Sequence, residues 1–193
     1  MTAKHKRFYT LEEYFALVKE SEERYEYWNG EIFLMGGASP EHVFIADNLL
    51  TILNPQLAGR NCRAMSSDIR IKVPTAPPFR YADVTVACVP FEFEEIGGLK
   101  VLVNPILIVE VLSHSSERSD HTKKFSFYQS ISSFREYLLI SQKEACITQY
   151  VKQADNTWEP EEITGLDATL FLPSINCTLV LSEVYRGVDL KGK

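Results

Sequence analysis

Glu110 is the residue that most needs a chemical explanation, because it stands in an otherwise apolar segment. The segment Ile106–Leu112 consists of aliphatic residues apart from this one carboxylate. An ionised carboxylate that is buried without a partner is strongly destabilising, or else it takes up a proton. We therefore expect Glu110 to contact a cation, a hydrogen-bond donor or a metal ion.

Two further carboxylates precede Glu110 on successive predicted strands. Asp83 opens the segment Asp83–Ala87, and Asp68 opens an alternating segment before it. Three acidic residues on successive strands can converge at one end of a sheet. Because Mg²⁺ prefers oxygen ligands and is commonly held by one or two carboxylates with water and substrate phosphate, the pattern indicates a divalent-metal site.

A phosphodiesterase site also needs a positive group near the attacking water or near the charge that develops on phosphorus. Lys124 is the candidate, since it follows the Glu110 strand on a predicted helix. Its alternative role is a surface ion pair with Asp120, because the two residues are spaced i, i+4 with the acid first. Asp83 has the alternative of capping a turn, and Asp68 that of a solvated side chain on a polar face.

Two other residues are weaker candidates. His42 lies in the first turn of a predicted helix, where a structural histidine is the simpler interpretation. Glu26 and Glu31 flank the Asn29-Gly30 turn, where exposed cross-strand charges are the simpler interpretation. A catalytic histidine is the less favoured alternative for His42, and the residue pattern alone assigns Glu26 no chemical role.

The elements that must position these residues alternate between helices and strands, which predicts an α/β (α+β) fold. Thr10 and Glu13 form a capping-box pattern before a helix over Leu11–Ser21. Asn29-Gly30 predicts a hairpin, and Ser39-Pro40 predicts the start of a long helix that ends at Gly59. The other predicted elements are strands at Asp68–Val73, Ala82–Val89 and Pro105–Leu112, a helix at Ser119–Ser132, strands at Glu136–Ser141 and Ala145–Val151, and short strands within Thr157–Leu181.

Length and composition indicate the domain organisation and limit the possible partners. With 193 residues, 45% hydrophobic and 24% charged, the chain predicts a single globular domain over residues 1–193, with a core of about residues 9–181. The net charge of −6 argues against a general nucleic-acid coat protein, so nucleic-acid contact would need a local basic patch.

The cysteines and the apolar segments indicate in which cellular compartment the protein is expected. The four cysteines form no C-x-x-C pair and imply neither a zinc ribbon nor a disulfide framework, so we expect reduced thiols. No apolar segment reaches the ~18 residues of a membrane span and no secretion signal is present. The expected location is the cytoplasm, with no membrane partner.

An ordered set of motifs resembles the Uma-type family of bacterial restriction endonucleases, within the PD-(D/E)XK nuclease superfamily. The similarity extends over roughly Tyr9 to Leu181. The matching residues are Tyr25–Glu31, Met35, His42, Asp68, Ala82–Val84, Val109–Ser113, Asp120, Lys124, Tyr128 and Phe134–Tyr137.

The resemblance implies a restriction-endonuclease-like core, in which helices flank a mixed sheet, with an N-terminal helix and hairpin and extra C-terminal strands. It implies that Asp83, Glu110 and the backbone carbonyl of Val111 bind Mg²⁺ (or Mn²⁺) for hydrolysis of DNA. Ala82 replaces the proline of the Pro-Asp step, and Leu112 stands where the superfamily has its lysine. The Uma-type pattern carries that lysine on the following helix, where Lys124 matches it.

The remaining expectations concern accessory groups and partners. Asp68, Glu26 and His42 match positions that the family shares and are candidate accessory residues. DNA would be drawn in by charges near the predicted site, for which the candidates are Arg70, Lys72, Arg118 and Lys123. A homodimer would allow both strands to be cut. The competing hypothesis is a catalytically inactive protein that keeps the fold and binds DNA or another protein.

Overall fold

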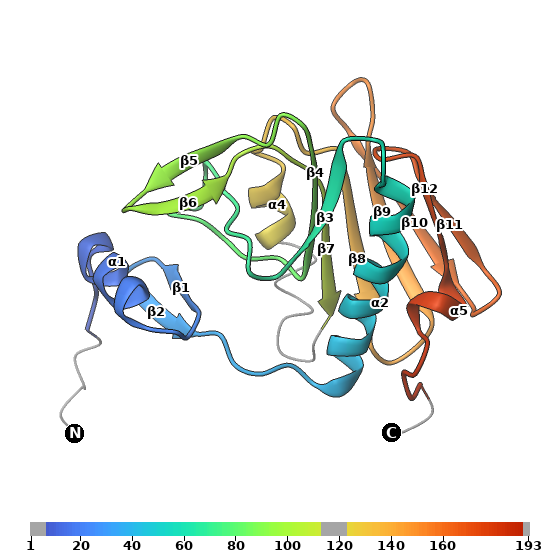
Figure 1. Cartoon of the computed structure of the whole chain (residues 1–193), viewed down its shortest axis with the longest axis horizontal. Helices are drawn as coiled ribbons and strands as arrows, with labels where there is room; N and C mark the ends of the chain where they lie inside the picture. The colour runs from blue at the N-terminus through green and yellow to red at the C-terminus, as the bar shows by residue number, and fades with distance from the viewer. Residues whose placement is uncertain (1–6, 113–122, 191–193) are drawn as a thin grey trace.

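A six-stranded mixed sheet forms the centre of the computed structural model, which describes residues 7–112 and 123–190. The strand order is β10-β9-β8-β7-β4-β3 (Figure 1). All neighbours are antiparallel except β7 and β8, which run parallel. The strands are β3 (Cys62–Ser66), β4 (Val84–Cys88), β7 (Pro105–Leu112), β8 (Glu136–Ser141), β9 (Cys146–Lys152) and β10 (Trp158–Thr164).

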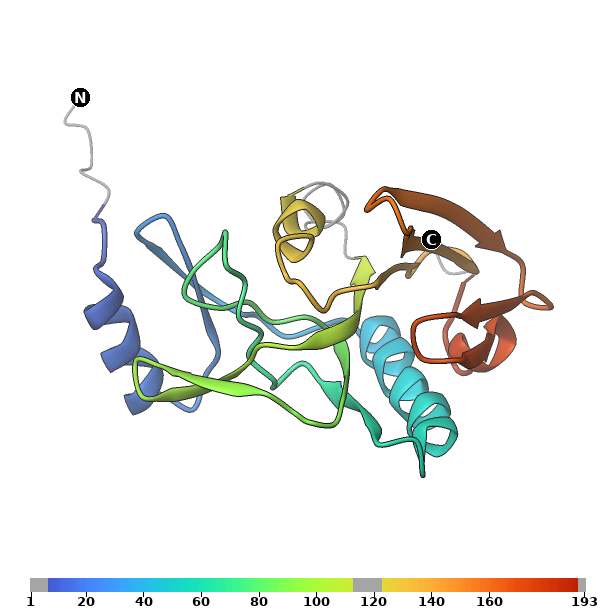
Figure 2. The same cartoon turned by 90° about the horizontal axis from the view of Figure 1, so that it is seen from above.

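Two helices flank this sheet. Helix α2 (Pro40–Leu57) and helix α4 (Phe125–Tyr128) lie on opposite sides of it (Figure 2). Around this core, residues 7–112 and 123–190 form three two-stranded sheets and two further helices. These are α1 (Leu11–Glu20), the hairpin β1 (Tyr25–Trp28) and β2 (Glu31–Leu34), the hairpin β5 (Phe93–Ile96) and β6 (Leu99–Leu102), the pair β11 (Thr169–Leu172) and β12 (Cys177–Val180), and α5 (Leu181–Val184).

The residues of β7 alternate between two cores. Val109 and Val111 pack with α2 and the C-terminal strands, whereas Ile108 packs with the aromatic residues around α4. A third cluster joins α1, the first hairpin and β6 through Tyr14 and Val101. Because side chains of a strand alternate between faces, Glu110 lies on the same side of β7 as Ile108 and faces α4.

Local sequence signals explain the elements that carry the site. The Thr10 side chain accepts a hydrogen bond from the Glu13 amide, and the Glu13 carboxylate accepts one from the Thr10 amide, which confirms the capping box. Ser39 caps α2 by accepting from the His42 amide. Asn29 and Gly30 both have positive φ (47° and 86°), as the predicted hairpin turn requires.

Two sequence-based elements were wrong or shorter than predicted. The segment Asp68–Val73 is not a strand of the sheet, since Asp68 lies in a turn after β3 and Ile71 makes only isolated bridges to Arg80 and Leu102. The alternation that suggested a strand reflects burial instead, because Ile71 and Val73 are buried. Of the predicted helix Ser119–Ser132, the part from 119 to 122 lies outside the described residues, and α4 comprises only Phe125–Tyr128.

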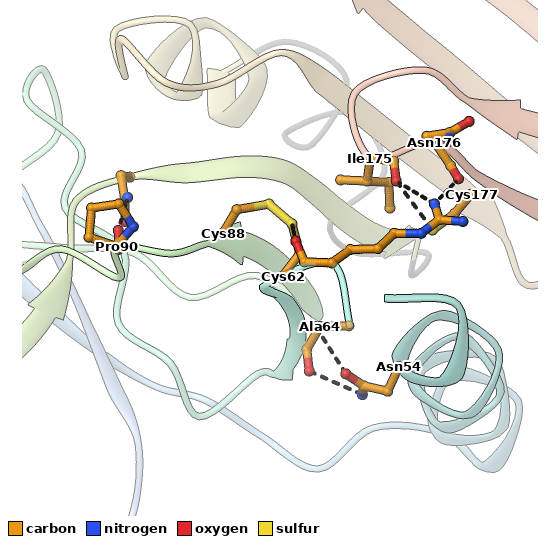
Figure 3. Close-up of a disulfide and its surroundings, with 10 residues drawn as sticks. Asn54, Cys62, Ala64, Cys88, Pro90, Ile175, Asn176 and Cys177 are labelled. Carbon is orange, nitrogen blue, oxygen red and sulfur yellow. Dashed lines mark hydrogen bonds between the residues drawn. A yellow bond between two sulfur atoms is a disulfide. The ribbon is translucent and has the colours of Figure 1, made fainter. Parts of the chain in front are cut away.

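The expectation of four reduced thiols was also wrong. Cys62 and Cys88 form a disulfide between β3 and β4 (Figure 3). The two residues are 26 positions apart in sequence, but the antiparallel register of β3 and β4 places them directly opposite each other. Cys146 and Cys177 remain free thiols. The pairing depends on strand register, which residue spacing does not contain.

No helix within residues 7–112 and 123–190 is both long enough and apolar enough to cross a membrane.

Candidate functional site

Asp83 lies directly before β4, where its carboxylate reaches two neighbouring elements. Oδ2 accepts a hydrogen bond of 2.7 Å from the backbone amide of Val111 on β7. Oδ1 lies 2.9 Å from Nε2 of His42 on α2. The Asp83 amide also donates to the carbonyl of Val109. The Asp83 side chain therefore continues the β4–β7 ladder beyond the last strand residue, and it is still 19% exposed.

His42 belongs to a chain of hydrogen bonds that fixes its ring. Gln142 donates from Nε2 to the carbonyl of Leu112 at 2.9 Å and accepts from the Ser39 hydroxyl at 2.7 Å. The same amide nitrogen faces Nδ1 of His42 at 3.3 Å. Because Gln142 presents a donor, Nδ1 acts as an acceptor, and Nε2 carries the hydrogen that is donated to Asp83.

Glu110 has a different environment, because it is buried in the sheet with only 4% of its side chain exposed. Oε2 forms an ion pair of 3.1 Å with Nζ of Lys124, immediately before α4. Oε1 accepts a hydrogen bond of 2.8 Å from the Tyr128 hydroxyl. The expectation that Glu110 must have a cation or a donor is therefore confirmed, and it has both.

Tyr128 is fully buried, and its protonation state follows from that position. Burial raises the pKa of Tyr128 well above its ordinary value, and the nearby carboxylates of Glu110 and Glu26 raise it further. The phenol therefore stays protonated and remains a hydrogen-bond donor. Its role is to hold Oε1 of Glu110 while Lys124 compensates the charge at Oε2.

Asp83 is linked to the backbone beside Glu110 by one hydrogen bond. The amide that donates to Asp83 belongs to the peptide group linking Glu110 to Val111. Asp83, just before the first residue of β4, accepts this hydrogen bond. The Glu110 side chain, on the other side of the same peptide group, points toward α4 and contacts Tyr128. The structure thus pairs Glu110 with Lys124 and Asp83 with His42, and it joins the two pairs through the Val111 amide.

A large cavity opens beside Asp83. Its volume is about 1130 Å³, and it lies between the first hairpin, the start of α2, the turn after β3 and residues close to the C-terminus. Its acidic lining residues outnumber its basic ones. The acidic ones are Glu26, Glu41, Asp47, Asp83 and Asp189, and the basic ones are Arg24 and Lys143.

A smaller cavity of about 230 Å³ lies on the Lys124 side. Its lining residues are Glu26, Trp28, Phe33, Arg80, Lys123 and Lys124. Glu26 and Phe33 line both cavities and so stand between them. Oε1 of Glu26 is buried and has no hydrogen-bond partner within the part of the chain that the structure describes.

Other predicted site residues are held elsewhere. The Asp68 side chain is 82% exposed and pairs with Arg24 at 3.3 Å. Lys72 pairs with Glu94 at 2.5 Å. The guanidinium of Arg70 lies over the ring of Phe79 at 5.6 Å from its centroid and over the ring of Tyr81 at 5.9 Å. Arg118, like Asp120, lies outside the described residues, whereas Lys123 is exposed and lines the smaller cavity.

Sequence reasoning assigned no role to two residues that hold the site together. Gln142, the residue after β8, connects the start of α2 to the end of β7, and Tyr128 holds Glu110. For Gln142 the sequence contains no signal, because its three partners are far away along the chain. For Tyr128 a signal exists, since it follows Lys124 by four residues and therefore shares its helix face.

Comparisons with known proteins agree with this architecture. Residues 11–182 match the Uma2 family model, whose description is "Putative restriction endonuclease". An uncharacterised protein of Synechocystis is 32% identical over 177 residues, covering 92% of this chain and 91% of the relative. A second uncharacterised Synechocystis protein is 33% identical over 161 residues, covering 83% and 90%.

A solved structure resembles the fold. It is the crystal structure of a "putative nuclease belonging to DUF820" from Anabaena variabilis, which aligns with a TM-score of 0.70 and 22% identity. The alignment covers 91% of this chain and 97% of that one. At this level of identity the likeness shows a shared fold, which confirms the predicted mixed sheet flanked by helices.

Proposed function

Because the chain belongs to the Uma2 family, described as "Putative restriction endonuclease", we propose that it is an endonuclease that hydrolyses DNA phosphodiester bonds with Mg²⁺ or Mn²⁺. The observation that carries the proposal is the hydrogen bond to Asp83 from the peptide group that links Glu110 to Val111, together with the ion pair between Glu110 and Lys124. These are two oxygen-donor side chains and one cation, which is the donor set that phosphodiester hydrolysis by a hard metal ion needs.

The residues present fit a hard divalent cation. No group of three or more His, Cys, Asp or Glu residues is arranged as a metal site within the described ranges. Mg²⁺ does not require such a cage, since it keeps several waters and takes one or two carboxylates together with substrate phosphate. The buried Oε1 of Glu26 adds an oxygen atom between the two cavities.

In this proposal Asp83, Glu110 and the carbonyl of Val111 would hold the ion. When bound, the metal would activate water and stabilise the charge that develops on the phosphorus centre. Lys124 neutralises the scissile phosphate or orients the nucleophile. His42 keeps Asp83 in place through its Nε2 hydrogen, because Gln142 fixes the orientation of the ring.

DNA is the proposed substrate, and Lys123 is the predicted DNA contact that both lies at the site and is exposed. Arg70, Lys72 and Arg118 stay predictions. A homodimer is proposed because cleavage of both strands requires two sites, and two-fold symmetry is the commonest arrangement of oligomers. The whole chain, residues 1–193, is proposed to act as a single domain.

The experiment that tests this function compares cleavage of supercoiled plasmid by the native protein and by Asp83→Asn and Glu110→Gln, with Mg²⁺ or Mn²⁺. We expect metal-dependent nicking that each substitution reduces by ~100-fold or more. Glu161→Gln is the matched control, because Glu161 is an exposed carboxylate on the outer strand β10. Its activity should equal that of the native protein.

The competing function is an inactive nuclease fold that binds DNA or a protein. It is favoured by the existing Glu110–Lys124 ion pair, which already balances the buried charge without a metal. If the native protein cuts nothing and calorimetry detects no binding of Mn²⁺, the endonuclease proposal is wrong. Cleavage that is equal in native protein and both variants would place the activity outside Asp83 and Glu110.

A further inference from the structure

The two cavities beside the candidate site differ in charge. The larger one is predominantly acidic, which suits a metal ion. The smaller one contains three cationic side chains, Arg80, Lys123 and Lys124, against the single carboxylate of Glu26. A cationic pocket beside an acidic one suits a phosphate group that must lie next to the metal.

Phe33 stands at the boundary of these cavities and lines both of them. It lies opposite Glu26 in the β1–β2 register, so the two side chains are on the same face of the hairpin. The other face of the hairpin, with Tyr25, Tyr27 and Ile32, packs against the cluster around α1. The face that carries Phe33 is therefore the one turned toward the site.

The Phe33 ring is open to a ligand. It is 49% exposed. Trp28, on the same face, is already engaged, because the Arg80 guanidinium lies 4.5 Å above its ring and Phe127 meets it edge-on at 5.2 Å. Trp28 and Arg80 thus pack together on one side of the smaller cavity, and Phe33 presents an exposed aromatic ring to a ligand.

An aromatic ring beside lysines is the combination that binds unpaired nucleotides, since bases stack on the ring and phosphates contact the cations. In duplex DNA the bases are already stacked and paired, so they offer no free face to Phe33. We infer that this protein prefers DNA with unpaired bases, and that Phe33 stacks on a base next to the phosphate held at Lys123 and Lys124. This inference rests on the proposed nuclease function and names its substrate class.

The test measures binding by fluorescence anisotropy in EDTA, so that no cleavage occurs, with a labelled single-stranded oligonucleotide and the matching duplex. We expect the native protein to bind the single strand more tightly. Phe33→Ala should weaken single-strand binding by roughly 5- to 100-fold and leave duplex binding within about twofold. Phe33→Trp should restore single-strand affinity, because it replaces one stacking ring by a larger one.

Two controls separate stacking from other effects. Phe171→Ala removes an equally exposed phenylalanine (54%) on β11 and should change nothing. An abasic strand keeps the phosphates but has no bases, so native protein and Phe33→Ala should bind it alike. Equal losses on single strand and duplex, or no loss at all, would overturn the inference.

The two proposals can fail separately. If plasmid cleavage depends on Asp83 and Glu110 while Phe33→Ala leaves single-strand affinity intact, the nuclease stands and the substrate preference is wrong. If binding depends on Phe33 but no metal supports cleavage, the stacking surface stands and the endonuclease is wrong.

Discussion

Asp83 and Glu110, the two carboxylates of the proposed site, have unlike surroundings. Asp83 is 19% exposed, borders a cavity of about 1130 Å³ and is held by a backbone amide and the His42 ring. Glu110 is 4% exposed, and a lysine and a buried phenol hold it from within the protein. Water can replace a lost partner of Asp83, but it cannot reach Glu110 in the same way.

The difference in exposure predicts different roles for the two carboxylates. A carboxylate at the edge of a cavity can exchange water for a metal ion at low cost, because it remains partly solvated. A buried carboxylate must be compensated before any ligand arrives, and Lys124 supplies that compensation. We therefore expect changes around Glu110 to affect folding stability strongly, and changes around Asp83 to affect it weakly.

The largest effect on stability is expected for Lys124→Met. It removes the cation that balances the buried Glu110 carboxylate, which should lower the free energy of unfolding by about 3 kcal/mol. Urea denaturation monitored by circular dichroism measures it. Lys123→Met, at the exposed neighbouring position, should stay within about 0.5 kcal/mol of the native protein.

A second variant shows whether charge is the cause. Combining Lys124→Met with Glu110→Leu removes both charges and should recover most of the lost stability. If the double variant is no more stable than Lys124→Met alone, lost packing of the lysine stem explains the effect and the comparison fails.

The next effect is that of Tyr128→Phe, which deletes the hydroxyl bonded to Glu110 at 2.8 Å. A hydrogen bond to a buried charged acceptor contributes about 2 kcal/mol, so urea denaturation should show a loss of that size. Tyr27→Phe is the matched control, because the Tyr27 hydroxyl donates to the neutral carbonyl of Tyr9, and its loss should be about 1 kcal/mol. Equal losses would mean that the charge of Glu110 does not matter.

Sequence patterns predicted the strands that carry Glu110 and the element beside it. The bounds of β7 (Pro105–Leu112) and β8 (Glu136–Ser141) are those predicted, since a central strand that is covered on both faces reads as a continuous apolar segment. The hairpin over Asn29-Gly30 followed from local turn chemistry. Such elements are determined by residues next to each other in the sequence.

The segment Asp68–Val73 shows that an alternating pattern predicts burial but not strand pairing. Alternation predicts which side chains are buried, and Ile71 and Val73 are buried as expected. It does not say whether a neighbouring strand is available, and here the backbone has only isolated bridges through Ile71. The disulfide between Cys62 and Cys88 likewise depends on a register that only the folded sheet defines.

The charged residues of the candidate site could be selected from the sequence, but the residues that contact them could not. Glu110 stands out because a carboxylate in an apolar strand demands an explanation, whereas Asp83 could equally have capped a turn. Gln142, which orients the His42 ring, is 100 residues away from it in sequence and carries no local pattern. Such residues become visible only when the chain is folded.

Glu136 sharpens the comparison, because it is a buried carboxylate with neutral donors in place of a cation. It is fully buried and accepts hydrogen bonds from Gln149 and from the amide and hydroxyl of Ser174. Burial raises the pKa of Glu136, while the donors from Ser174 and Gln149 lower it less. The folded protein therefore holds this proton more tightly than the unfolded chain does.

The sign of the pH effect follows from that difference in proton affinity. The contribution of Glu136 to stability is fully present below the pKa of the unfolded chain, about 4.3, and is lost as the pH rises through the higher pKa of the folded state. The loss can approach about 1.4 kcal/mol for each tenfold difference in proton affinity between the folded and unfolded states. Urea denaturation between about pH 4 and pH 7 should show native protein losing stability relative to Glu136→Gln; a constant difference would contradict it.

The smallest effect on the free energy of unfolding is expected beside Asp83, the more exposed carboxylate. His42→Ala removes the donor to Oδ1 of Asp83, but water can reach a side chain that is 19% exposed, and Oδ2 keeps its bond to the Val111 amide. The free energy of unfolding should therefore fall by only about 0.5–1 kcal/mol, well below the loss in Tyr128→Phe. A loss in His42→Ala as large as that in Tyr128→Phe would show that Asp83 is as dependent on internal partners as Glu110, and the division between an open and a compensated carboxylate would have to be abandoned.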